Sequence, residues 1–149
     1  MADDATVTIS ATILPDEIAK TIAGTMTLSP ADANDKWYYK FTSVSNASTD
    51  LIAGYCTDYT AVDDDTAPTA VHTADKVKFL FIKNTDGSND VYLVFDGGTV
   101  STSAGDAIKV PAGTAWFGQL PNTTVAEVHA NTSTSTGNCL VAALIDDVA

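Results

Sequence analysis

The residues that could do chemistry in this chain are two histidines, two cysteines and two acid-rich turns. His72 lies in an acidic loop and His129 on an expected strand, whereas a cupin-type metal site needs several histidines and a carboxylate that converge. Cys56 and Cys139 each lie inside an apolar run, which favours free, buried thiols over a disulfide. Gly-x-Ser-x-Gly elbows and phosphate-cradling glycine loops do not occur. We therefore expect no catalytic, cofactor-binding or metal-binding residues, and a protein that is not an enzyme.

The acid-rich segments are Asp63–Asp65 and Asp86–Asp90, and each could offer oxygens to calcium. Neither follows the calcium-loop pattern, in which a central Gly is followed by a Glu at the twelfth position. Asp, Asn, Gly and Ser are also the residues that close turns through side-chain hydrogen bonds. We interpret both segments as solvated turns and expect no bound metal.

The charge balance excludes a phosphate-rich partner. The chain has seventeen Asp, two Glu, seven Lys and no Arg, for a net charge of −12. Nucleic-acid affinity comes from cations that displace counterions from the backbone, so nucleic acid is not expected as a partner. The acidic start of the chain lacks the basic region of a signal peptide, and its apolar runs are too short to span a bilayer. A soluble protein made in a reducing cytoplasm, with no membrane partner, is the expectation.

Period-two patterns predict the fold. Val77–Asn84 and Val91–Phe95 are dense β-patterned runs on either side of the turn at Asp86–Asp90. Twenty-two Thr and the scarcity of charged helix formers favour strands further. The expected architecture is all-β: an antiparallel, jelly-roll-like β-sandwich of about nine or ten strands. The other expected strands are Lys36–Val44, Leu51–Thr60, Ala115–Leu120, Thr124–Ala130 and Cys139–Ile145.

The N-terminus has the cleanest alternation in the chain. Ala5–Ile13 alternates small apolar residues with Thr and Ser, whereas Pro15–Gly24 fits either one turn of helix or the start of a strand. We favour a turn that leads into a strand from about Lys20 to Leu28. The domain expectation is a strand or arm over residues 1–14 and a single sandwich over 15–149. An arm of this kind can add a strand to a neighbour's sheet, and an edge strand of the same sandwich is the alternative.

Aromatic residues form the next pattern. Trp37, Tyr39 and Phe41 share one face of a strand, and such a stripe is expected in the core. Tyr38 points the other way and is predicted to be a surface contact. With the arm, the candidate partner interface is Val7, Ile9, Ile13 and Tyr38. A sugar-stacking platform is the alternative use of the aromatics Trp37, Tyr38, Tyr39, Tyr55, Tyr59 and Trp116.

The segment Lys76–Leu120 resembles virion structural proteins of tailed bacteriophages. These proteins often carry a strand that ends in a Lys-Asn-Thr-like turn, a second that ends in Asp-Gly-Gly, and a Pro-x-Gly corner before an aromatic strand. The corresponding residues here are Ile82–Thr85, Tyr92–Gly98 and Pro111–Trp116. The small, acidic, Thr-rich and Arg-free chain also looks like marine phage virion proteins. The resemblance implies a β-sandwich or jelly roll that self-associates and docks on a capsid, neck or tail.

The resulting functional expectation is a non-enzymatic virion protein, in first place a capsid decoration or cement protein that stabilises the phage head. A neck, tail or head-fibre component and a carbohydrate-binding attachment module are the alternatives. The expected partners are the major capsid protein and other copies of the chain, with a trimer favoured. Strands that are apolar on both faces, such as Cys139–Ile145, motivate the homo-oligomer. The expected location is the virion, assembled in the cytoplasm of the host bacterium.

Overall fold

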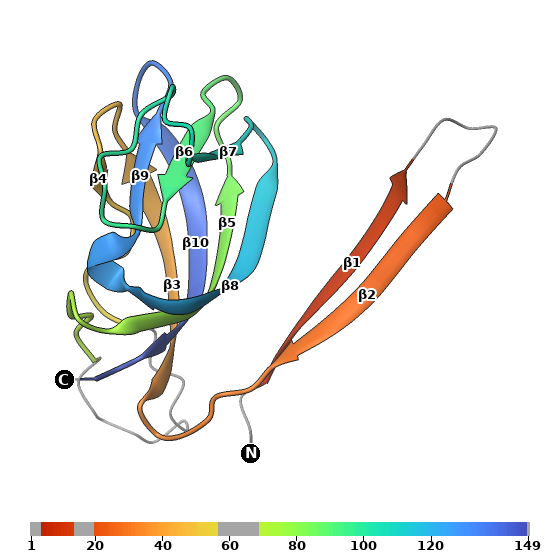
Figure 1. Ribbon diagram of the computed structural model, residues 1–149, viewed down its shortest axis with the longest axis vertical. Coiled ribbons are helices and arrows are strands. Elements are labelled where there is room, and N and C mark those ends of the chain that lie inside the picture. The colour runs from red at the N-terminus through yellow and green to blue at the C-terminus, as the bar shows by residue number, and fades with distance from the viewer. Residues whose placement is uncertain (1–3, 14–19, 57–68, 149) are drawn as a thin grey trace. The chain divides into compact units, whose positions relative to one another are not determined.

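The fold is all-β and divides into two units. The computed structural model describes residues 4–13, 20–56 and 69–148. Residues 1–33 form one unit and residues 34–149 the other (Figure 1). Ten antiparallel strands and one short 3-10 helix make up the described part, which confirms the expected fold class. Jelly-roll connectivity stays a prediction.

The N-terminal unit contains a hairpin of two nine-residue strands. Strand β1 (Ala5–Ile13) pairs with β2 (Lys20–Leu28) in continuous antiparallel register from Ala5 opposite Leu28 to Ile13 opposite Lys20. The expected strand over Lys20–Leu28 is therefore confirmed. The expected boundary at residue 14 needs correction, because β2 belongs with β1 and the unit ends at residue 33.

The second unit contains two four-stranded sheets. One has the order β3-β10-β5-β8 and the other β4-β9-β6-β7 (Figure 1). The bounds are β3 Asp35–Val44, β4 Thr49–Asp50, β5 Lys76–Asn84, β6 Val91–Val94, β7 Ile108–Val110, β8 Ala115–Thr124, the helix η2 Val125–Glu127, β9 His129–Thr132 and β10 Gly137–Asp146. Both sheets contribute to one buried apolar cluster, so the arrangement is that of a sandwich.

Two expected strands are not continuous strands in the structure. Leu51–Thr60 is not a strand over residues 51–56, where the chain bends and forms one isolated bridge, between Tyr55 and Ala70. Gly54 has a φ of 103°, which breaks the extended run, and residues 57–60 lie outside the described part. The expected strand Thr124–Ala130 is replaced by η2 and β9.

The core is built from aliphatic side chains, the two cysteines and one tyrosine. Val77, Leu80 and Ile82 of β5 are fully buried, as is Val141 of the neighbouring β10. Tyr38 is also buried, at 1% exposed, and its hydroxyl donates to the carbonyl of Ala53 at 3.2 Å. Tyr38 was predicted to be a surface contact, and that prediction is wrong. Its strand turns the even-numbered residues inward, and the hydroxyl finds a backbone partner there.

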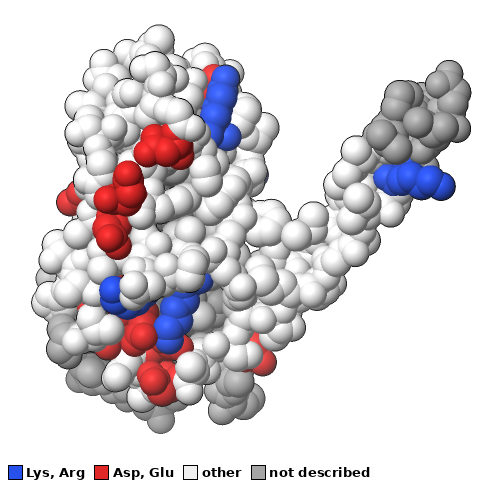
Figure 2. All heavy atoms as spheres, viewed as in Figure 1, with Lys and Arg blue, Asp and Glu red and all other residues white. Residues whose placement is uncertain are grey.

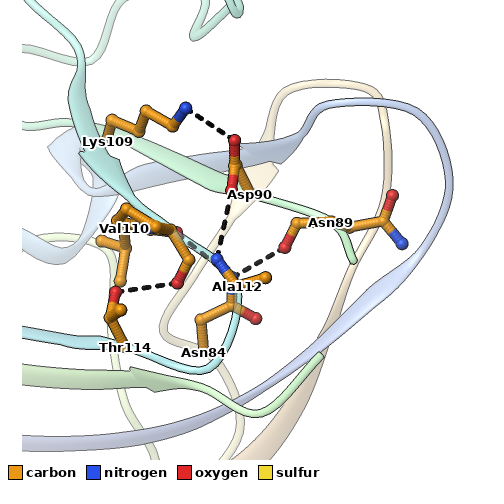
Figure 3. Close-up of polar contacts among 8 residues, drawn as sticks. Asn84, Asn89, Asp90, Lys109, Val110, Ala112 and Thr114 are labelled. Carbon is orange, nitrogen blue, oxygen red and sulfur yellow. Dashed lines mark hydrogen bonds and ion pairs between the residues drawn. The ribbon is translucent and has the colours of Figure 1, made fainter. Parts of the chain in front are cut away.

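A polar network fixes the loops at one end of the sandwich (Figure 3). The buried amide of Asn84 donates to the carbonyls of Asn89 at 2.8 Å and Val110 at 3.1 Å. Asp90 accepts from the backbone N–H of Ala112 at 3.1 Å and pairs with Lys109 at 2.7 Å. The turn after β5 and the corner before β8 are thus tied to one another by side chains.

We expect Asn84→Ala to destabilise the sandwich by about 2–3 kcal/mol, because two buried carbonyls lose their donor. Chemical denaturation monitored by tryptophan fluorescence measures this. Asn138→Ala, at an exposed position on β10, is the matched control: it loses one solvent-exposed hydrogen bond, donated by Ser43 at 2.8 Å, and should cost less than about 1 kcal/mol. Equal stability of Asn84→Ala and wild type would show that the network does not hold these loops.

Candidate interaction surfaces

The groups that could react are engaged in structural contacts. The side chain of His129 on β9 lies 2.8 Å from the carbonyl of Gly98 through Nδ1 and 3.2 Å from Asp50 of β4 through Nε2. Both ring nitrogens therefore face oxygen atoms of neighbouring segments. His72 lies in the exposed loop before β5. Each histidine belongs to a different part of the fold, so together they do not suggest a metal site.

The two cysteines are free and buried, as predicted. Burial raises the pKa of the Cys56 thiol to about 11, with nearby Asp75 adding to the effect. Burial likewise raises the pKa of Cys139 to about 11. Since the thiolate is the nucleophile, these environments do not activate either cysteine.

We expect both thiols to react slowly with a disulfide reagent in the folded protein. A pKa near 11 alone lowers the thiolate fraction at mildly alkaline pH on the order of a hundredfold relative to an unperturbed thiol. The measurement is the labelling rate at matched pH with and without denaturant. A folded-state rate as fast as the unfolded-state rate would mean that the sites are open.

The carboxylates engage in turn and ion-pair chemistry. Oδ1 of Asp86 accepts from the backbone N–H groups of Ser88 and Asn89, both at 2.8 Å. These bonds, that of Asn89 first, lower the pKa of Asp86 from its usual 3.8. The expected turn role of Asp86–Asp90 is confirmed, whereas Asp63–Asp65 lie outside the described residues.

A second group of carboxylates surrounds a lysine. Lys78 on β5 pairs with the buried Asp35 at 2.6 Å and with Asp146 at 3.2 Å. The hydrogen bond to Asp35 is the main cause that raises the pKa of Lys78. The one ammonium group bridges two carboxylates and thereby joins β5 to β3 and β10 in an ion-pair network.

The lowered pKa of Asp86 predicts a pH dependence. A carboxyl whose folded pKa lies below its unfolded value stabilises the fold above the unfolded pKa, and this contribution is lost as pH falls through the folded pKa. We therefore expect Asp86→Asn to melt below wild type at about pH 7, and the difference in melting temperature to shrink as the pH is lowered toward about 2. Asp106→Asn, in an exposed loop, is the control substitution. A melting difference between Asp86→Asn and wild type that is the same at both pH values would contradict this assignment.

The outer face of the sheet β3-β10-β5-β8 is a large apolar surface. Strand register places Tyr39, Ala142, Phe81 and Phe117 in one row across all four strands. Residues that lie opposite one another in an antiparallel sheet share a face. The row on one side contains Trp37, Leu144 and Phe79, and the row on the other side contains Phe41, Leu140 and Lys83. We call this surface the aromatic face: Trp37, Tyr39, Phe41, Phe79, Phe81, Phe117, Leu140, Ala142 and Leu144.

The residues of β3 on the aromatic face were expected to lie in the core. Trp37, Tyr39 and Phe41 do share one strand face, as predicted, but that face is not the core. Tyr39 is 56% exposed and Phe41 57% exposed, on the edge strand β3. Phe79 and Leu144, in the row with Trp37, are buried. The prediction of a core stripe is therefore wrong for Tyr39 and Phe41.

The hairpin carries a second apolar surface. Register places Val7 opposite Met26 and Ala11 opposite Ile22, whereas Thr and Ser dominate the other side of the hairpin. Several of these apolar residues are exposed: Ile9 at 41%, Ile13 at 46% and Ile22 at 61%. We call this surface the hairpin face: Ala5, Val7, Ile9, Ala11, Ile13, Ile22 and Met26. Three of the four predicted interface residues lie on it, and Ile22 and Met26 were missed because the pairing of β1 with β2 was not foreseen.

Both surfaces lack carboxylates in a strongly acidic protein. Strands β1 and β2 carry Lys20 as their one charged residue, and the rows of the aromatic face carry Lys83 as theirs. Figure 2 shows the described hairpin as largely white, against acidic and basic patches on the other unit. Uncharged apolar surfaces in such a background are typical of protein contact sites.

Comparisons with protein-family models, curated proteins and solved structures give no match to this chain. No helix in the described part is long and apolar enough to cross a membrane. The functional argument therefore depends on the two apolar surfaces themselves.

Proposed function

We propose that this chain is a non-enzymatic structural protein of a tailed-phage virion, a capsid decoration protein that stabilises the head through subunit contacts. The observation that carries the proposal is the hairpin face, which exposes three isoleucines on a separate unit. A two-stranded hairpin is only marginally stable alone in water, so an apolar hairpin needs a partner. The resemblance of Lys76–Leu120 to virion proteins suggests that this partner is another virion protein.

The chemistry of the surfaces supports an assembly role. A decoration protein acts by mass action, because it binds the assembled shell and not its dissociated parts. Exposed aromatic and branched aliphatic side chains such as Tyr39, Phe41 and Ile22 are the usual energetic anchors of such contacts. We propose further that the chain self-associates, with a trimer favoured, and that it contacts the major capsid protein.

The test is reconstitution on phage particles that lack this chain. We expect purified protein to co-sediment with the heads, to raise the temperature at which they rupture, and to give regularly spaced sandwich density on the shell by electron cryo-microscopy. The double variant Ile9→Thr, Ile22→Thr should bind at least tenfold more weakly, since burial of one such side chain contributes about 1.5–3 kcal/mol. Ala23→Thr, on the opposite hairpin side, is the matched control.

Density at the neck or tail alone would favour a neck, tail or fibre component instead. No binding to any part of the particle would contradict the virion role.

A carbohydrate-binding attachment module is the second candidate function. The exposed pair Tyr39 and Phe41 on one strand face favours it, because sugar rings stack on such aromatic side chains. Glycan-array binding that is lost in Tyr39→Ser and retained in Ile22→Thr, an exposed apolar residue of the hairpin outside the aromatic set, would support this function.

A further inference from the structure

We infer that the hairpin face of one copy packs on the aromatic face of a second copy. The inference rests on the assembly role proposed above and names the two surfaces that make the contact. Each surface is apolar, each is at least partly exposed, and each belongs to the same polypeptide. A second copy of the chain therefore brings a surface of matching chemistry at equal concentration.

The hairpin is narrow enough to lie on the aromatic face. Nine-residue strands make the hairpin roughly 30 Å long and about 10 Å wide. Four strands make the receiving sheet about 19 Å wide, so the hairpin covers part of it as a second layer. Two such contacts, exchanged reciprocally, bury on the order of 1,200 Å², which is at the lower limit for a specific protein interface.

Charge opposes contact between two copies over most of the molecule and opposes it least at these two surfaces. Two molecules with a net charge of −12 repel one another wherever carboxylates face each other. The hairpin strands and the rows of the aromatic face contain no carboxylate, and their charged residues are Lys20 and Lys83. Contact through this pair of surfaces thus avoids the repulsion between acidic side chains.

The contact is heterologous, because a hairpin on one copy meets a sheet on the next. One such contact per neighbour closes into a ring when the rotation allows it, whereas two copies that exchange the contact reciprocally share one two-fold, isologous interface. The buried area favours the reciprocal dimer over a trimeric ring, because each interface of a ring contains only one of these contacts. In every closed assembly each copy uses both of its surfaces, and this gives a sharp test.

The test uses two variants that each lose one surface. The hairpin variant is Ile9→Thr, Ile22→Thr, and the sheet variant is Tyr39→Ser, Phe41→Ser. Sedimentation velocity of the full chain up to about 100 μM should show wild-type oligomers, with apparent dissociation constants at least tenfold higher in either variant. Ala23→Thr and Tyr55→Ser are the controls for each surface and should associate as wild type does. Circular dichroism and thermal melts verify that each sandwich is folded.

Mixing the two variants identifies the occupant of the sheet. The intact hairpin of the sheet variant can dock on the intact aromatic face of the hairpin variant. The mixture should therefore form heterodimers at concentrations at which each variant by itself is monomeric. A wild-type monomer at the highest concentration, or a mixture that stays monomeric, overturns the inference. Association that survives both variants assigns the contact to other surfaces and overturns it as well. Self-association that follows this pattern without binding to phage heads would leave the inference standing and contradict the virion role.

Discussion

A β-sheet with apolar side chains on both faces must be covered on both, and this constraint governs the structure. The sheet β3-β10-β5-β8 buries one face against the second sheet of the sandwich. Its other face carries four of the five phenylalanines of the chain, with Trp37 and Tyr39 beside them. The same constraint applies more strongly to the hairpin, because two strands cannot bury an apolar face by themselves. The outer face of this sheet and the apolar face of the hairpin are therefore both available to a partner.

The loops have a different physical basis from these surfaces. Asn84, Asp86 and Asp90 close turns by side-chain hydrogen bonds to backbone groups. These residues lie in and around the Lys-Asn-Thr-like turn and the Pro-x-Gly corner on which the resemblance to virion proteins rests. In this structure the motifs therefore determine how β5 leads into β6 and β7 into β8. They define architecture, while the apolar surfaces carry the argument for assembly.

Much of the fold could be predicted from the sequence, because period-two alternation is a local property. Alternation in β1, β2 and β5 indicated strands, and the thiols of Cys56 and Cys139 were correctly expected to be free and buried. Alternation says which residues share a face but not which face is inward. Tyr38 and Tyr39 were therefore exchanged between core and surface. The inward direction is set by long-range pairing of β3 with β10, which no local pattern encodes.

The hairpin face was only half predicted for the same reason. Val7, Ile9 and Ile13 were found from alternation within one strand, whereas Ile22 became part of the surface through the register of β2 against β1. Two interpretations, helix and strand, competed over Pro15–Gly24 in the sequence, and the structure shows β2 from Lys20. Pairing thus turned a single predicted arm into a two-stranded surface.

The central claim is that the hairpin depends on a partner for its stability, and amide hydrogen exchange tests it most directly. The account predicts that amides of β1 and β2 exchange quickly in dilute protein and become protected as concentration rises. Amides of β5 and β10 in the sandwich core should stay protected at every concentration, because their stability is internal to one copy. Hairpin amides that are as protected as the core at high dilution would show a self-sufficient hairpin. That result would contradict the account.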